Sequence, residues 1–230
     1  MNGEDVARRV LTRYSDDVVE ATFKGINKGV IDDLYKLDGE DLAVFFENYK
    51  SSGKNIDDFL DDFDSMKNIE GFDKVNKRFN DRLKLDGDSY LNTKGEVAEI
   101  QHTAYMKDTK GYTIDEVSRS AQGTDFEFDS VGWDTSNNHF VGETKSITDD
   151  SIDLMSDNDI DNWINKHVTK KMDDYKTGID SDPDLDDVSH VKYTIPESAH
   201  NHQRFNSKFD QAISNAEQST GLSIEVIDIP

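Results

Sequence analysis

The sequence contains no cysteine among its 230 residues. This absence excludes disulfide bonds, thiolate metal sites and catalysis by a nucleophilic cysteine. The sequence also lacks an apolar run long enough to cross a membrane, and Arg8 and Arg9 interrupt the apolar residues near the N-terminus. Hydrophobic residues make up only 34% of the chain. We therefore expect a soluble protein of one large or two small domains, without a signal peptide or membrane insertion.

Basic residues are scarce: 26 lysines and arginines stand against 49 acidic residues, for a formal net charge of -23. Three explanations compete, namely adaptation to high salt, imitation of nucleic acid, and binding of many calcium ions. We favour the halophilic explanation, because the acidic residues are spread along both halves of the chain. The excess of lysine (19) over arginine (7) argues against it.

The N-terminal region, residues 1–90, has the apolar spacing of successive helices. Apolar residues recur at helical intervals around Val18 to Ile26, Val30 to Leu34 and Leu42 to Tyr49, and a last helix is expected over 68–84. Asn55 is a candidate N-cap. The polar, glycine-containing stretch 85–92 marks the boundary to a second domain, residues 91–230.

The second domain changes to an alternation of helices and strands. We expect an α/β fold with a mixed β-sheet flanked by helices, preceded by the all-α N-terminal region. The predicted elements are a helix at 93–107, strands at 124–133 and 138–147, a helix at 158–177, a strand at 188–195, a helix from about 205 to 216, and a last strand from 222.

The chemistry-bearing residues gather on the predicted strand pair. Glu143 and Lys145 are two residues apart, so they point to the same face of an extended strand, and Asp129 can lie near Glu143 across the hairpin. Two carboxylates brought together repel each other unless a cation lies between them. Oxygen ligands without thiolates suit Mg²⁺ or Mn²⁺. The cation would polarise a scissile phosphate, and Lys145 would orient a water or offset charge on the phosphorus.

This pattern of Asp129, about fourteen residues, and then Glu143-Thr144-Lys145 resembles the core motif of the PD-(D/E)XK, or restriction-endonuclease-like, nuclease superfamily. The resemblance covers about residues 93–230. It implies a mixed sheet flanked by helices and magnesium-dependent hydrolysis of phosphodiesters, with DNA expected over RNA as the substrate. It also implies a third metal ligand on the preceding helix, where Gly95-Glu96-Val97-Ala98-Glu99 makes Glu99 the first candidate and Glu96 the second.

Two alternatives stay open within this interpretation. Asp125 follows Gly123 on the same predicted strand and competes with Asp129 for the role of metal ligand, although we prefer Asp129. No proline precedes the aspartate, which departs from the family pattern. The bland alternative is that Glu143 and Lys145 form a surface ion pair on an edge strand.

A second resemblance concerns the arrangement of the two regions. A helical module followed by a small nuclease resembles the C-terminal part of polymorphic toxins. It implies a toxin domain delivered from a larger secreted protein, acting in the cytoplasm of a host or target cell, with a cognate immunity protein as partner. The rival function from another class is a non-catalytic acidic binding or inhibitor protein that imitates nucleic acid.

Other motifs carry less chemistry. The run Asp180 to Asp187 has the acidity of a calcium loop but lacks its glycine and closing glutamate, so we interpret it as a solvated loop. His200 and His202 could bind zinc but have no evident third ligand. His102 lies one turn beyond Glu99 and is expected to be a partly exposed helix residue. Trp133 and Phe140 are expected in the hairpin core.

Overall fold

The computed structural model describes residues 12–16, 18–19 and 39–230. The helices predicted around Val18 to Ile26 and Val30 to Leu34 lie almost entirely outside these residues. The chain forms two compact units. The first holds the described residues up to Asn68 and Phe72–Ala104, and the second holds Ile69–Gly71 and Tyr105–Pro230.

The first unit is helical, as predicted. It contains α3 (Gly39–Ser51), α4 (Ile56–Met66), α5 (Phe72–Leu83) and α6 (Ser89–Ala104). The predicted cap is confirmed, because the Asn55 side chain accepts a hydrogen bond from the Asp57 amide at 3.1 Å. Burial of aromatic rings, with successive centroids 4.9–6.2 Å apart, supplies the hydrophobic stabilisation of the unit. The buried rings are Phe45, Phe46, Tyr49, Phe59, Phe63, Phe72, Phe79 and Tyr90.

The division between the units falls at Ala104, whereas the sequence predicted a boundary near residue 90. The reason is that α6 packs on α3, α4 and α5. Asn48 donates a hydrogen bond to Ser89 at 3.0 Å, and Gln101 donates one to the Tyr49 hydroxyl at 3.0 Å. The Gly95–Glu99 motif therefore belongs to the helical unit.

The second unit is built on one five-stranded sheet with the strands in chain order. The first three strands are antiparallel neighbours, and β4 and β5 continue parallel to β3. The expectation of a mixed sheet flanked by helices is confirmed. The strands are β1 (Thr113–Ser120), β2 (Glu127–Trp133), β3 (His139–Thr144), β4 (His190–Pro196) and β5 (Ser223–Ile229).

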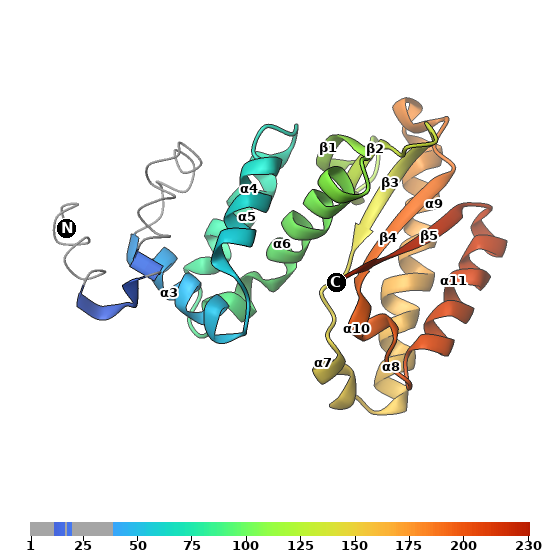
Figure 1. The fold of residues 1–230 in the computed structure, drawn as a ribbon. Coiled ribbons are helices and arrows are strands. Elements are labelled where there is room, and N and C mark those ends of the chain that lie inside the picture. The colour runs from blue at the N-terminus through green and yellow to red at the C-terminus, as the bar shows by residue number, and fades with distance from the viewer. Residues whose placement is uncertain (1–11, 17, 20–38) are drawn as a thin grey trace. The chain divides into compact units, whose positions relative to one another are not determined.

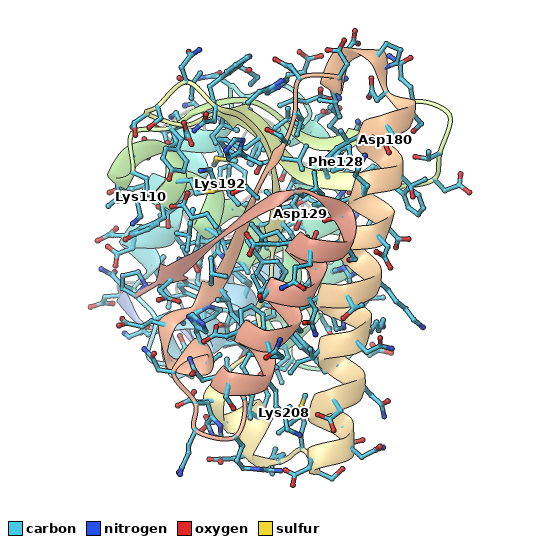
Figure 2. The ribbon with its side chains drawn as sticks, turned by 90° about the vertical axis from the view of Figure 1, so that its right-hand side faces the viewer. Lys110, Phe128, Asp129, Asp180, Lys192 and Lys208 are labelled. Atoms are coloured by element: carbon cyan, nitrogen blue, oxygen red, sulfur yellow. The ribbon has the colours of Figure 1, made fainter. Side chains whose placement is uncertain are left out.

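Helices between β3 and β4 and between β4 and β5 cover one face of this sheet (Figure 1). Figure 2 shows α9 and α11 side by side in this layer, with Phe128 and Asp129 of β2 behind them. Among the described residues, no helix is both long and apolar enough to cross a membrane. The elements around the strands are η2 (Tyr105–Thr109), α7 (Asp149–Asp153), α8 (Asp157–Ile164), η3 (Asn165–Thr169), α9 (Lys170–Ser181), η4 (Pro183–Leu185), α10 (Glu197–His200) and α11 (Asn206–Thr220).

The helix predicted at 158–177 exists, but a π-helical turn, η3, interrupts it between α8 and α9. Four buried residues, Ile160, Ile164, Val168 and Met172, follow one another at intervals of four. At 3.6 residues per turn, twelve residues of α-helix would rotate Met172 by about 120° from Ile160. The π turn holds more residues per turn, so each of its residues rotates by a smaller angle. All four side chains therefore face the sheet.

Candidate active site

Glu143 is the buried centre of the candidate site. It lies at the carboxyl end of β3, and its side chain is 0% exposed. Two ammonium groups compensate its charge: Lys145 forms an ion pair with Oε1, and the Lys171 Nζ lies 3.4 Å from Oε2. The Tyr175 hydroxyl of α9 donates a short hydrogen bond to Oε2 and lies 3.0 Å from the Gly142 carbonyl oxygen.

The interpretation of Glu143 and Lys145 as a surface pair on an edge strand is wrong. The strand β3 is central in the sheet, between β2 and β4. The backbone beyond β3 stays attached to β4, because the Lys145 amide donates to the Thr194 carbonyl oxygen at 3.0 Å. Thr194 in turn donates its hydroxyl proton to the Glu143 carbonyl oxygen at 3.2 Å. These contacts fix both residues of the motif at the end of a rigid strand.

Asp129 lies on the neighbouring strand β2, beside the same strand end. Its Oδ2 accepts a hydrogen bond from the Thr144 amide at 2.6 Å, so its carboxylate reaches the backbone between Glu143 and Lys145. The competing candidate, Asp125, lies in an exposed turn before β2 begins. The structure therefore brings Asp129, Glu143 and Lys145 together and leaves Asp125 outside the cluster.

The carboxylates of Asp129 and Glu143 affect the pKa values of two tyrosine hydroxyls near them. Burial, together with the negative charges of Glu143 and Asp129, holds the pKa values of Tyr175 and Tyr193 well above their usual value of 10.0. Both phenols therefore keep their protons at neutral pH. Tyr175 uses its proton for Glu143, and Tyr193 donates to the His167 carbonyl oxygen at 3.2 Å.

His167 lies in η3, within reach of the charges of the cluster. Burial lowers its pKa to about 4, and the positive charges of Lys145, Lys166 and Lys171 act in the same direction. The imidazole is therefore neutral at pH 7. His167, Tyr193 and Thr194 could not be predicted from the sequence, because they lie 24 to 51 residues away from Glu143 along the chain and only the fold brings them near.

The donor set of the cluster fits a hard divalent cation. Asp129 and Glu143 offer carboxylate oxygens, and Glu143 Oε1 is buried with the Lys145 ammonium as its ion-pair partner. Mg²⁺ is commonly bound through one or two carboxylates and keeps several waters. Among the described residues, no group of three or more histidine, aspartate or glutamate side chains is assembled that could hold a metal ion.

Glu99 and Glu96, the predicted third ligands, are buried on α6 in the helical unit. There Glu99 accepts a hydrogen bond from Arg78 Nη2 at 2.7 Å, and Glu96 Oε1 lies 2.7 Å from Arg82 Nε. Both carboxylates thus have arginine partners within their own unit. A role for Glu99 at the cation site stays a prediction.

The weaker candidates have structural roles. His200 lies between Asp228 at 2.6 Å and Asp210 at 3.0 Å, whereas His202 pairs with Asp153, so the two histidines share no ligand site. In the acidic run 180–187, Asp182 is not solvated, because it is buried against Arg119 at 3.0 Å. Of the predicted hairpin core, Phe140 is fully buried, and Trp133 is partly exposed and stacks on His139 at 4.3 Å.

Two further features lie away from the cluster. Lys192, buried on β4, pairs with Asp134 at 2.8 Å and Glu225 at 2.6 Å; although burial opposes its charge, these partners raise its pKa. An open cavity of about 390 Å³ lies at the amino ends of β4 and β5, between Asp180 and Leu222. That is the opposite end of the parallel strands from Lys145 and Thr194, so the cavity does not belong to the candidate site.

Comparison of the chain with protein-family models, curated proteins and solved structures gave no match. The arrangement of Asp129, Glu143 and Lys145, with its surroundings, is therefore what indicates the chemistry of this chain.

Proposed function

We propose that the chain is a metal-dependent nuclease of the restriction-endonuclease-like kind, with DNA as the preferred substrate. The observation that carries the proposal is the buried Glu143 at the end of a central strand, paired with Lys145 and flanked by Asp129 on the adjacent strand. Leaving a carboxylate in the interior is costly unless it is paired. A site that combines two carboxylates with two ammonium groups matches what phosphodiester hydrolysis needs.

Each residue has a definable task in this proposal. Asp129 and Glu143 would hold Mg²⁺ or Mn²⁺, which when bound stabilises charge on the scissile phosphate and lowers the pKa of a water. Lys145, with its side chain 18% exposed, can turn its ammonium from Glu143 toward an incoming phosphate and orient the attacking water. Tyr175 holds the Glu143 carboxylate in one orientation through its hydroxyl proton.

The net charge of -23 favours a rival, an acidic binding protein that presents carboxylates in place of phosphates. The nuclease requires the cluster of Asp129, Glu143 and Lys145, and the binding protein does not. A mimic works through its exposed acids, whereas Glu143 is completely buried and cannot contact a partner protein directly. We therefore prefer the nuclease.

Nicking of supercoiled plasmid by the purified protein tests the proposal. We expect nicked product with Mg²⁺ or Mn²⁺ and none with a chelator, in both dilute and molar KCl. If plasmid, linear DNA and tRNA all survive at both salt concentrations, the nuclease proposal fails. Cleavage of tRNA alone would retain the nuclease and correct the substrate.

We also propose that the nuclease acts as a toxin and that a cognate immunity protein inhibits it. Expression of the wild-type chain in bacterial cells should arrest growth, whereas a Lys145→Ala variant at equal abundance should not. Cleavage in vitro without any growth arrest would keep the enzyme and remove the toxin.

A further inference from the structure

Three basic side chains on the helices that cover the sheet of the second unit are matched with an acidic partner. Each forms an ion pair with a carboxylate, which neutralises its charge toward solvent. The pairs are Lys176 with Asp180, Arg204 with Asp157, and Lys208 with Asp161.

Lys166 and Lys170 differ from these residues. Both side chains are exposed, and within the part of the chain that the structure describes neither forms an ion pair. In a chain of net charge -23, two neighbouring exposed ammonium groups without a carboxylate are unusual. Surface lysines of this kind gain nothing for the fold, which directs attention to what they could bind.

Their position connects them to the candidate active site. The two residues are four apart, and Lys166 belongs to the π turn η3 while Lys170 begins α9. The next residue, Lys171, approaches Glu143 Oε2 to 3.4 Å. The turn itself is fixed to β4, since the Tyr193 hydroxyl donates to the His167 carbonyl oxygen.

Lysine charges gather around His167, which lies between Lys166 and Lys170 in sequence. Burial lowers the pKa of His167, the charges of Lys145, Lys166 and Lys171 lower it further, and the charge of Glu143 raises it. Three ammonium groups and one carboxylate thus act on one imidazole. The buried apolar row of the same helix, which includes Val168 and Met172, faces the sheet, so the exposed lysines project from the opposite side.

We propose that Lys166 and Lys170 form a phosphate-binding strip, which receives the backbone of duplex DNA next to the phosphate that is cleaved. The inference rests on the proposed nuclease function and adds the surface by which the substrate is held. Residues four apart on a helix have Cβ atoms about 5–6 Å apart. Phosphates of one strand follow at about 3.4 Å along the duplex axis. The two lysines can therefore contact neighbouring phosphates, without reading the base sequence.

The test compares two double variants that lose the same charge. Lys166→Gln/Lys170→Gln removes the strip, and Lys176→Gln/Lys208→Gln removes two lysines of the same layer whose partners Asp180 and Asp161 neutralise them. Figure 2 labels Asp180 and Lys208, which lie near opposite ends of this layer. Circular dichroism of both variants should equal that of the wild type, because all four side chains lie at the surface.

Binding is measured by fluorescence anisotropy of a labelled 20-base-pair duplex in chelator, over a series of KCl concentrations. For the strip variant we expect Kd to rise at least about tenfold in dilute buffer, and the slope of log Kd against log salt to fall by about 2. In plasmid cleavage with Mg²⁺, KM should rise by a larger factor than kcat falls. The control variant should stay within about twofold of the wild type in each quantity.

Equal effects of the two double variants would overturn the strip while leaving the nuclease intact. A fall in kcat without a change in KM or Kd would also overturn it, because the lysines would then act in the chemical step. If the wild type itself neither binds nor cleaves any nucleic acid, the proposed function fails and the strip fails with it.

Discussion

Glu143 brings a carboxylate into the interior, and its neighbours are the residues that such a group requires. An unpaired charge at this depth would be strongly destabilising, and even a paired one seldom adds to stability. Lys145, Lys171 and Tyr175 all converge on its two oxygens. A chain selected for stability alone would place an apolar side chain here, and this is why we propose a chemical role for the carboxylate.

Tyr175→Phe tests the proposed orientation of Glu143. The substitution removes the hydroxyl proton from a buried carboxylate, and we expect the free energy of unfolding to fall by about 1–3 kcal/mol. Affinity for Mg²⁺, measured by titration calorimetry, should fall as well. Tyr193→Phe is the matched control, since its hydroxyl bonds a backbone oxygen instead. Equal losses of metal affinity in the two variants would refute a specific role for Tyr175.

His102 provides a pH dependence that can be measured. It is 5% exposed on α6 rather than partly exposed as predicted, and burial, with a smaller contribution from Lys54, lowers its pKa to about 3. The unfolded chain binds a proton near pH 6.5, and the folded chain does not. The stability contribution is therefore complete above about pH 6.5 and is lost as the pH falls toward 3, by at most about 1.4 kcal/mol per pH unit.

Urea unfolding of the wild type and of His102→Gln at pH 7, 5.5 and 4 isolates this contribution. The wild type should lose stability relative to the variant as the pH falls, because other titrating groups cancel in the difference. Parallel pH curves for the two proteins would show that His102 takes up a proton in the folded state.

At the scale of elements, the sequence predicted those helices and strands whose apolar spacing is regular. It missed β1, where Ile114 and Val117 are three residues apart. The register against β2 shifts between Ile114 and Glu116, and such a bulge destroys the alternation that identifies a strand. The π turn η3 was missed for a related reason. Over a single turn an interval of four residues is also α-helical spacing, and only the whole row from Ile160 to Met172 departs from it.

The motif itself was easier to find than its context. Glu143 and Lys145 share a face by strand geometry, and the hairpin brings Asp129 to them. The choice between Asp129 and Asp125 depended on where β2 begins, which is at Glu127. Propensity defines such ends poorly, so only the structure separates the two aspartates.

Gly132 is required by the approach of β1 to β2. A Cβ atom at this position would lie 2.1 Å from the Thr113 carbonyl oxygen, so Gly132→Ala should destabilise the sheet unit by about 3 kcal/mol. Gly95, in the interior of α6, has no atom within 4 Å of such a Cβ, and Gly95→Ala should stabilise the helical unit by about 0.5–1 kcal/mol. Thermal unfolding measures both changes. A change in stability of the same sign in both variants would contradict this packing.

At the scale of the molecule, the boundary between the units could not be inferred from composition. Leu85 to Asp88 resembles a linker, and it is only the turn between α5 and α6. The division falls where α6 passes into η2 at Ala104, and the helical residues 96–109 around this point contain neither glycine nor proline. Packing decides this boundary, since Val97, Ile100 and Ala104 are buried in the helical unit's last helix.

The charge of -23 belongs to this scale as well. Repulsion among the acidic residues should destabilise the folded chain at low ionic strength, and salt should screen it. We expect the melting temperature to rise steadily from dilute buffer to molar KCl. NaCl should act like KCl if the effect is screening. A flat or falling melting curve would count against adaptation to high salt.

The most direct test of the central claim is the single-turnover rate of plasmid nicking at saturating Mg²⁺ by wild type, Lys145→Ala, Glu143→Gln and Asp125→Asn. Lys145→Ala should lower the rate about 10²-fold or more while Mg²⁺ still binds, because it removes an electrostatic stabiliser and leaves the ligands. Glu143→Gln should lower both the rate and the affinity for Mg²⁺. Asp125→Asn should match the wild type. Nicking that survives unchanged in both Lys145→Ala and Glu143→Gln would place the chemistry elsewhere and contradict the account.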